Sequence, residues 1–322
     1  MNKVSSRGLY IGDPHFIDHI PNRKDNFLNS ISTKFQESLE IARNIGLDYL
    51  VILGDLFNQC EPPAVVRNKV VEILAKGNGG KKWPFDIFLT IGNHDLYYHS
   101  SSTLEKTAIK TLETTGLIKI VKSSEKYGIY FGHFEHGIEK HKINVDFPIL
   151  AMHSNILPHK AIMDHVLISD FSTNDNNKLV VSGHYHDGYP IMEKSPGLFF
   201  ANPGALGRIS VTDMKRTVQV MMVELNRGEV DNIEYIPLTS AQPGSLIFDE
   251  KIIDAKKRKE LDISEFVKSI DSAKIIINQK TDILGAIKQF GIDNNIEKQI
   301  IDEAVRRIMG VAKKEIENND DE

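Results

Sequence analysis

Residues 48–55 read DYLVILGD, an apolar run that ends in a glycine and an aspartate. A short apolar run closed by a turn residue is typical of a strand buried on both faces. Asp55, the last residue of the run, is a metal-ligand residue type placed where the expected strand ends. Similar arrangements recur along the chain, so this stretch indicates both a fold class and the position of a site.

Strands and helices alternate through the first half of the chain. The apolar spacing predicts strands at 8–12, 48–53, 85–91 and 117–121, and helices at 26–45, 64–75 and 103–114. Such alternation indicates an α/β domain with a largely parallel sheet. Further strands are expected at 128–132, 147–152, 178–182, 198–201 and 218–224. We therefore expect two sheets packed face to face as a sandwich, flanked by helices.

The composition changes at residues 237–244, PLTSAQPG, which we interpret as a linker. The expected domains are residues 1–240 and a small C-terminal α+β appendage, residues 241–322. The appendage is expected to contain a strand at 246–253 and a last helix at about 292–312. Basic side chains at 251–259 either follow a nucleic-acid backbone or form an ordinary solvated surface.

The bulk composition excludes some classes of protein. The chain has 322 residues, 41% of them hydrophobic, and a formal net charge of -5, which gives no support for nucleic-acid binding. A bound metal pair can still reverse the charge locally. Cys60 is the single cysteine, which excludes an intrachain disulfide and fits a reducing compartment. No apolar run approaches the about 18 residues of a membrane span, so we expect a cytoplasmic protein with no membrane contact.

Five short segments place metal-ligand residue types directly after an apolar run. They are Asp13-Pro14-His15, Gly54-Asp55, Gly92-Asn93-His94-Asp95, His153, and Gly183-His184-Tyr185-His186. Each histidine alone would more often be structural, but the whole series is hard to obtain by chance. Because sites in open α/β sheets lie beyond the carboxyl ends of the strands, these loops should converge. Carboxylates, imidazoles and one amide suit Mn²⁺, Fe or Zn²⁺, and Asp55 is the natural carboxylate to bridge two metals.

The order DxH, GD, GNHD, H and GHxH resembles the calcineurin-like metallophosphoesterases over about residues 8–225. The resemblance implies hydrolysis of a phosphoester by a water activated by two divalent metals. It implies that His94 contacts the phosphate and protonates the leaving oxygen without being a ligand. It also implies a first metal held by Asp13, His15, His186 and Asp55, and a second held by Asn93, His153, His184 and the shared Asp55.

Four segments give a narrower resemblance to the Mre11/SbcD nucleases, namely GDLF at 54–57, GNHDL at 92–96, GHYHDGYP at 183–190 and ANPGALGR at 201–208. This resemblance implies a DNA exonuclease or endonuclease of DNA repair, recombination and replication. It implies Mn²⁺ as the main metal, with Fe, Zn²⁺ or Mg²⁺ as alternatives. The implied partners are DNA, a second copy in a homodimer, and an SbcC/Rad50-like ABC-type ATPase that docks on residues 241–322.

One position departs from the nuclease pattern, in which a histidine usually stands three residues after the bridging aspartate. Here Asn58 occupies that position. Its side-chain oxygen could accept a hydrogen bond from His94, but it could not raise the basicity of His94 as a carboxylate does. We count His94, Asn58 and Asp95 as candidate catalytic residues. Arg208, after a turn expected to face the metals, is a candidate for phosphate contact.

Other histidines are interpreted as surface residues. HFEH at 133–136 is expected to be a solvated turn. His99, close after the GNHD loop, is interpreted as an exposed residue in preference to a substrate contact. Two further functions stay open beside the nuclease. The net charge and Asn58 favour a phosphatase or nucleotide phosphodiesterase acting on a small substrate. A non-catalytic scaffold is disfavoured because every ligand position of the motif is present.

Overall fold

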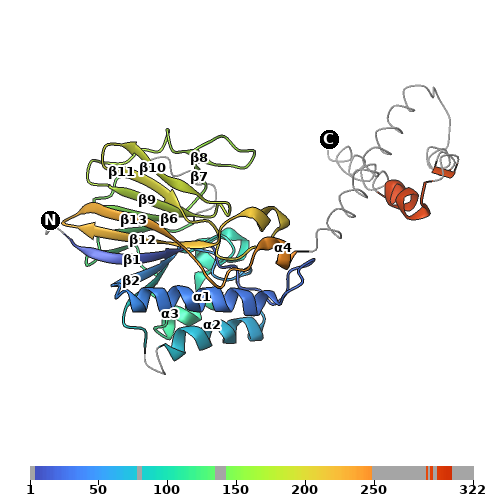
Figure 1. Ribbon diagram of the computed structural model, residues 1–322, viewed down its shortest axis with the longest axis horizontal. Coiled ribbons are helices and arrows are strands. Elements are labelled where there is room, and N and C mark those ends of the chain that lie inside the picture. Colours follow the sequence, from blue (N-terminus) through green and yellow to red (C-terminus); the bar gives the residue numbers. More distant parts are fainter. Residues whose placement is uncertain are drawn as a thin grey trace. The chain divides into compact units, whose positions relative to one another are not determined.

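Strand β2 (Tyr49–Ile52) lies inside a five-stranded sheet of the computed structural model, and all four of its residues are buried (Figure 1). The strand order is β13-β12-β1-β2-β3, with β2 parallel to both of its neighbours. The other strands are β1 (Ser6–Ile11), β3 (Asp86–Leu89), β12 (Gln219–Asn226) and β13 (Glu229–Pro237). The structure describes residues 4–77, 82–134, 143–248, 288, 291–292 and 296–306.

A second sheet has six strands in the order β10-β11-β9-β6-β5-β4. Its centre is parallel, because β6 pairs in parallel with both β5 and β9. The strands are β4 (Ser123–Ser124), β5 (Ile129–Gly132), β6 (Ile149–His153), β9 (Leu179–Gly183), β10 (Tyr189–Ser195) and β11 (Leu198–Asn202). A separate pair joins β7 (Ile156–Leu157) to β8 (Val166–Leu167).

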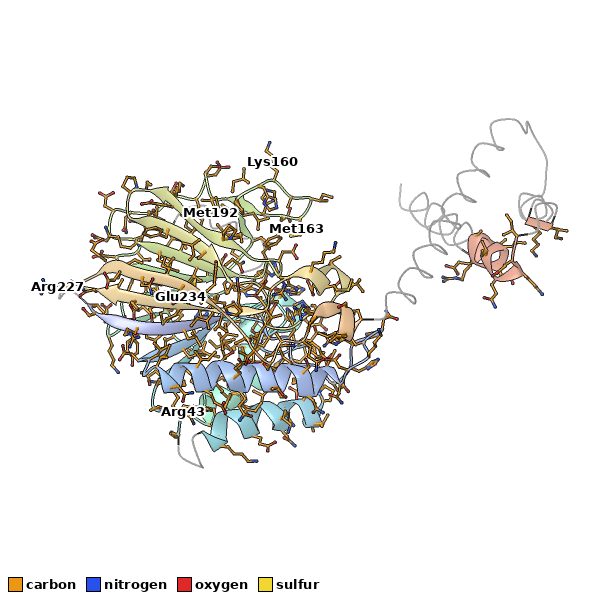
Figure 2. The ribbon with its side chains drawn as sticks, viewed as in Figure 1. Arg43, Lys160, Met163, Met192, Arg227 and Glu234 are labelled. Carbon is orange, nitrogen blue, oxygen red and sulfur yellow. The ribbon has the colours of Figure 1, made fainter. Side chains whose placement is uncertain are left out.

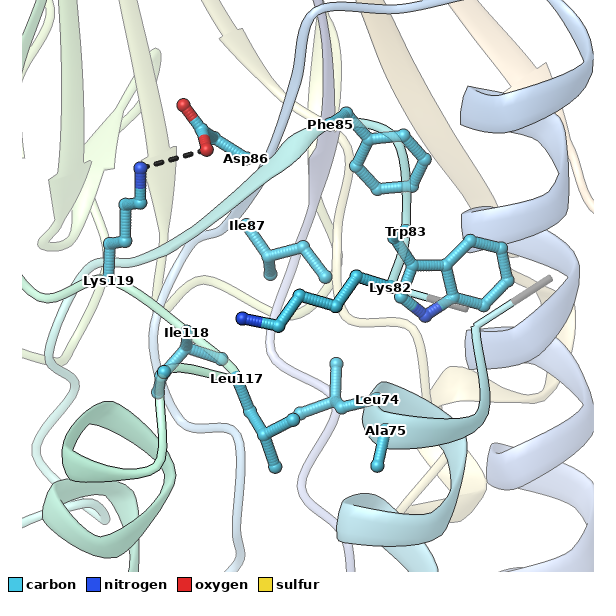
Figure 3. A pocket seen from close by; sticks show the side chains of 11 residues that line it. Leu74, Ala75, Lys82, Trp83, Phe85, Asp86, Ile87, Leu117, Ile118 and Lys119 are labelled. Atoms are coloured by element: carbon cyan, nitrogen blue, oxygen red, sulfur yellow. Dashed lines mark hydrogen bonds and ion pairs between the residues drawn. The ribbon is translucent and has the colours of Figure 1, made fainter. Parts of the chain in front are cut away.

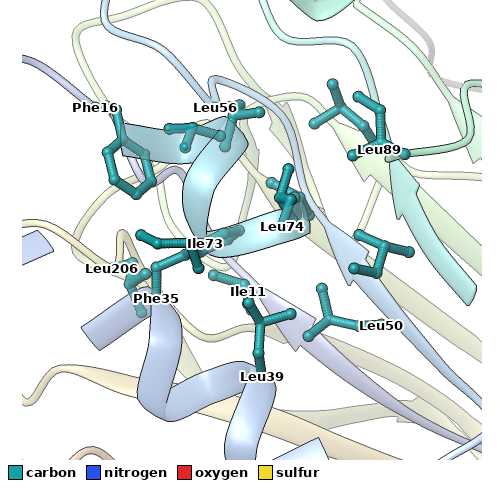
Figure 4. Close-up of a cluster of buried hydrophobic side chains, with 14 of the residues drawn as sticks. Ile11, Phe16, Phe35, Leu39, Leu50, Leu56, Ile73, Leu74, Leu89 and Leu206 are labelled. Atoms are coloured by element: carbon teal, nitrogen blue, oxygen red, sulfur yellow. The ribbon is translucent and has the colours of Figure 1, made fainter. Parts of the chain in front are cut away.

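The two sheets pack face to face through one buried cluster. Val51 and Phe88 of the first sheet meet Ile149 and Val181 of the second in this cluster. The alternate residues of β2, Leu50 and Ile52, face the opposite way into a larger cluster (Figure 4). That side is covered by the helices α1 (Phe27–Asn44), α2 (Ala64–Lys76) and α3 (Ala108–Thr114) (Figure 1). The expected α/β sandwich flanked by helices is therefore confirmed.

The outer face of the second sheet is covered differently. Leu150 and Val180 pack there against Ile168 and Phe171, which belong to the irregular chain between β6 and β9. Within this chain, the segment between β7 and β8 carries Lys160 and Met163 on the surface (Figure 2).

A cavity of about 450 Å³ lies between α2, the start of β3 and the chain after α3 (Figure 3). Leu74, Ile87 and Ile118 form part of its lining, and Lys119 is paired with Asp86 beside it. Asp86 is the first residue of β3, whereas the predicted ligands lie at or after the last residues of their strands. The cavity therefore belongs to the opposite end of β3 from those ligands.

Several expected elements differ from the structure. Residues 117–121 contribute one bridge, Phe88–Lys119, in place of a strand. The expected helix at 103–114 is divided at Thr107, with a 3₁₀ helix (Ser101–Lys106) before it and α3 after it. Strands β10 and β13 had no sequence prediction.

The chain divides into two compact units, residues 1–248 and 249–322. The stretch expected as a linker is bound to the first unit, because Glu37 accepts hydrogen bonds from Thr239 and Ser240. Residues 244–247, where a strand was expected to begin, form the short helix α4 (Gly244–Ile247). The domain boundary at residue 240 stays a prediction.

Most of the expected appendage, including the basic cluster at 251–259, lies outside the described residues. Of the last predicted helix, residues 298–306 are described and helical, with Ile300, Ile301 and Ala304 buried. Among all described residues, there is no helix with the length and apolarity needed to cross a membrane.

Candidate metal centre

The five predicted segments converge where strands of both sheets end. Ligand atoms of Asp13, His15 and His186 lie within 4.8 Å of one another, and so do those of Asp55, His153 and His184. A third group contains His15, Asp55 and His94, so the ring of His94 adjoins both of the others. The structure thus brings together residues from distant parts of the sequence.

Asp55 lies between the two groups. Its Oδ2 is 3.5 Å from the Nε2 of His15 and 3.5 Å from the Nε2 of His153. Its Oδ1 accepts a hydrogen bond from the backbone N–H of His94 at 2.8 Å. One carboxylate that adjoins two clusters of ligand atoms is the arrangement expected for a bridge between paired metals.

The backbone around the site is strained. Asp13, His15, Asp55 and His184 all have positive φ, at 32°, 46°, 47° and 75°. Such conformations are costly for residues other than glycine, and they persist where the surrounding structure holds them. Hydrogen bonds hold these loops together, since His184 N–H donates to Asp13 and His15 N–H donates to the Asp55 carbonyl. No pattern in the sequence had indicated this strain.

Close packing explains the glycine before the bridging aspartate. A Cβ on Gly54 would lie 2.1 Å from the Nδ1 of His153. The same nitrogen donates a hydrogen bond to the carbonyl of Leu53 at 2.7 Å. The His153 ring therefore lies directly against the turn that follows β2, where only glycine leaves room for it.

The protonation states of His15 and His184 suit metal binding, whereas His153 carries a proton that a metal would displace. Burial lowers the pKa of His15 and of His184 to about 3, so both imidazoles are neutral at pH 7 and have a lone pair for a metal. Burial alone would lower the pKa of His153, but the charge of Asp55 and its hydrogen bond raise it to about 9. The His153 Nε2 also lies 3.1 Å from the Oδ1 of Asn93, which accepts its proton. A cation at this position would replace that proton.

The pKa values of the two central carboxylates are shifted in opposite directions, although burial raises both. Burial raises the pKa of Asp13. Burial acts in the same direction on Asp55, but the charge of His153 and the nearby imidazoles outweigh it and hold the pKa of Asp55 well below its usual range. Both side chains are almost fully buried, at 0% and 1% exposure. Buried carboxylates this close together need positive charge nearby, which divalent metals would supply.

His94 has a partner other than the one expected. Its Nδ1 donates to the backbone carbonyl of Asn58 at 2.9 Å, whereas the sequence had suggested the Asn58 side chain. The expectation for that side-chain contact is therefore corrected to a main-chain contact. Because a carbonyl only accepts, the Nδ1 holds the proton and the Nε2 remains for exchange with a substrate.

Asp95 holds two loops of the site together through hydrogen bonds to their backbone. It is fully buried and accepts hydrogen bonds from the backbone N–H groups of Gly92, Asp55 and Leu56 at 2.9, 3.0 and 3.1 Å. Burial, reinforced by the charge of Asp55, raises the pKa of Asp95 to about 7. Its oxygens join the GD loop to the GNHD loop, which makes Asp95 a positioning residue and not a group that touches the reacting atoms.

The Arg208 side chain is buried and hydrogen-bonded to backbone carbonyls. It is 5% exposed, and its guanidinium donates to the carbonyls of Asp213, Gln242 and Arg216 at 3.2, 2.7 and 2.7 Å. These bonds hold the turn after the ANPGALGR segment. The geometry therefore argues against the expected phosphate contact, and a guanidinium bound to carbonyls is better explained as structural.

The ANPGALGR segment itself has a role that sequence reasoning had not given it. Gly12 pairs with Ala205, and Leu206 N–H donates to the Gly12 carbonyl at 2.7 Å. Ala205 N–H donates to the carbonyl of His186 at 2.9 Å. The segment thus connects the loop of Asp13 to the loop of His186. The small residues of this segment are the sequence feature that could have indicated this role, since small side chains permit such close contact between backbones.

These motifs match a family model described as calcineurin-like phosphoesterase over residues 7–188. The chain belongs to the calcineurin-like phosphoesterases. No curated protein matches the chain.

Among solved structures, the chain is similar to a dimetal phosphatase from Danio rerio, with 13% identity and a TM-score of 0.44 over 74% of this chain and 99% of that one. It is also similar to the protein TT1561 of Thermus thermophilus, with 11% identity and a TM-score of 0.40 over 73% of this chain and 99% of that one.

Calcineurin-like phosphoesterases are hydrolases that bind two divalent metals, and the residues present here fit such a pair. The Nδ1 of His15 is buried without a hydrogen-bond partner among the described residues. Neutral imidazoles, two buried carboxylates and one amide oxygen form a donor set suited to borderline divalent cations.

Proposed function

We propose that this calcineurin-like phosphoesterase is a metal-dependent DNA phosphodiesterase of the Mre11/SbcD type. The observation that carries the phosphodiester chemistry is Asp55, whose Oδ2 is 3.5 Å from histidines of two separate ligand groups. The DNA specificity is supported by the GDLF, GNHDL, GHYHDGYP and ANPGALGR segments, which resemble that nuclease branch.

The ligands divide into two sets around the shared carboxylate. Asp13, His15 and His186 would hold the first metal with Asp55, and Asn93, His153 and His184 the second. When bound, the pair supplies Lewis-acid stabilisation of the phosphate oxygens and lowers the pKa of a water. Mn²⁺ is the proposed metal, because oxygen and imidazole donors without thiolate suit it.

His94 is the proposed general acid. The Asn58 carbonyl and the Asp55 carboxylate hold the ring and its backbone in place. This keeps one proton on the Nδ1, so His94 acts as the acid in its imidazolium form, in which the Nε2 holds the second proton and gives it to the leaving oxygen. Asp95 acts through the loops that it joins, by keeping His94 and Asp55 at their relative positions.

The proposed partners follow from the same resemblance. They are DNA, a second copy in a homodimer, and an SbcC/Rad50-like ABC-type ATPase that would dock on the C-terminal region. Co-purification of the full chain with such an ATPase, compared with a chain truncated after Phe248, would test the last of these.

The nuclease proposal is tested with purified protein, Mn²⁺ and end-labelled single- and double-stranded DNA. We expect cleavage that stops with EDTA and falls by about 10² to 10⁴-fold in His94→Ala, the range for a general acid. His19→Ala is the matched control, because His19 is an exposed histidine outside the three ligand groups. Intact DNA combined with rapid hydrolysis of p-nitrophenyl phosphate would reject the nuclease and favour a phosphatase for small substrates.

A further inference from the structure

The loop after the GNHD motif contains two neighbouring residues with left-handed backbone. Tyr98 has φ 51° and ψ 26°, and His99 has φ 55°. Left-handed conformation costs roughly 1–2 kcal/mol per residue for side chains other than glycine, so two in succession are unusual. Strain of this kind clusters at ligand-binding sites, where the surrounding structure maintains it.

Hydrogen bonds hold this turn in its strained form. The backbone N–H of Tyr97 donates to the Oγ1 of Thr103 at 3.0 Å. The Nδ1 of His99 donates to the backbone carbonyl of Asn93 at 3.0 Å. Because Asn93 is one of the proposed metal ligands, this bond connects the His99 ring to the backbone of the loop that carries that ligand.

A line of aromatic contacts joins the turn to the second ligand group. The ring centroids of His99 and Phe134 are 6.1 Å apart. Phe134 in turn lies 6.2 Å from the ring of His153 and 6.0 Å from the ring of His184. Its backbone N–H is fixed by the Ile91 carbonyl at 2.9 Å. Phe134 therefore has one side on the proposed ligands and adjoins the exposed turn on the other.

Tyr98 is 91% exposed, although tyrosines in this chain are mostly covered. An exposed tyrosine alone needs no explanation, but this one is held in a strained turn next to the catalytic motif. Tyrosine offers a large planar surface at low entropic cost, because few of its torsions must be fixed on binding.

We infer that Tyr98, His99 and Phe134, here called the aromatic rim, stack against a planar ring of the substrate beside the scissile phosphate. This inference rests on the proposed function, in which the ring is a nucleobase of DNA. Every base has a π-face, so stacking on an aromatic rim binds single strands with little preference for sequence. Such a rim also fits an overall acidic chain, because it binds the nucleic acid without relying on positive charge.

The test compares two fluorescein-labelled oligonucleotides of equal length, one of thymidines and one abasic, by fluorescence anisotropy. Both carry the same phosphates, so they differ in the presence of the bases and not in backbone charge. The protein is the full chain in Mn²⁺ with His94→Ala, which slows cleavage of the bound DNA during the measurement. We expect this protein to bind the thymidine strand about tenfold more tightly than the abasic strand.

Two substitutions of Tyr98 form a matched pair. Tyr98→Asn tolerates left-handed backbone but has no ring, and it should abolish the preference for thymidine. Tyr98→Phe retains the ring and should keep the preference. Phe134→Leu retains apolar packing on His153 and should reduce the preference. Equal loss in Tyr98→Phe and Tyr98→Asn would overturn the inference.

The binding assay also separates this inference from the proposed function. If the unsubstituted protein does not cleave DNA but shows the ring-dependent preference for thymidine, the nuclease proposal is rejected and the inference about the aromatic rim is retained. If DNA is cleaved but thymidine and abasic strands give equal anisotropy, with or without binding, the nuclease stands and the rim is refuted.

Discussion

Gly54→Ala is expected to damage both the stability and the metal centre of this protein. Gly54 has φ 98°, and a Cβ there would lie 2.1, 2.7 and 2.9 Å from three atoms of the His153 ring. Real Cβ atoms essentially never approach within 3.0 Å, so the ring must move by about 0.9 Å. Positive φ costs an alanine roughly 1–2 kcal/mol, and overpacking adds typically about 1–3 kcal/mol. We therefore expect a loss of about 2–5 kcal/mol in the free energy of unfolding.

Gly197→Ala is the matched control. Gly197 has φ 78°, but a Cβ there would meet nothing within 4 Å. Gly197→Ala should therefore lose only the cost of positive φ, about 1–2 kcal/mol in the free energy of unfolding. Urea unfolding of both variants in EDTA measures the difference without a contribution from metal binding. Equal losses would refute the claim that the His153 ring lies against Gly54.

Activity should separate the same two variants more strongly. A displacement of about 1 Å in a catalytic constellation can cost about 10²-fold in rate. Gly54→Ala should therefore lose at least that factor in phosphoester hydrolysis and retain less metal by elemental analysis. Gly197→Ala should keep wild-type metal content and rate at a temperature where it is folded. Full activity in Gly54→Ala would show that the site tolerates movement of His153.

Three further predictions concern the fold, the general acid and the metals. Burial lowers the pKa of Lys34 to about 8 from 10.5, so the unfolded chain binds more protons between these values and stability should rise with pH in that window. The rise in the free energy of unfolding should be about 3 kcal/mol, and urea unfolding at several pH values should show that Lys34→Met lacks it. The same dependence of stability on pH in Lys34→Met would contradict the burial of the ammonium. Asn58→Ala should keep activity within about threefold, because the main-chain carbonyl binds His94; a loss as large as that of His94→Ala would implicate the side chain. Adding Mn²⁺ to metal-free protein should raise the melting temperature by mass action, and Asp55→Asn should remove most of the increase in a calorimetric scan.

The sequence predicted the parts of this fold that depend on continuous burial. Tyr49–Ile52 and Ile149–His153 are buried at every position, so their apolar runs are visible without any periodicity. Parallel strands end at one edge of their own sheet, so Asp13 had to lie near Asp55, and His153 near His184. These groupings within each sheet could be predicted for this reason, whereas the meeting of Asp55 with His153 depends on how the two sheets pack.

Other parts could not be predicted because local sequence does not determine them. Strand β13, EVDNIEYIP, is an edge strand with many exposed positions, so its composition resembles that of a loop. The direction of the Arg208 side chain depends on carbonyls up to 34 positions away. The contact of His94 with the Asn58 backbone follows from loop geometry that residue types do not encode.

The separation of the ligands along the chain sets the order of events during synthesis. Asp13 and His184 are 171 positions apart, yet the N–H of one donates to the carboxylate of the other. A ribosome must therefore release at least the first 186 residues of the unit 1–248 before the last ligand, His186, can join the site. Until then the first aspartates emerge without the imidazoles that complete the donor set. We therefore expect metal binding late in synthesis, after both sheets have assembled, so that bound metal indicates a folded catalytic site.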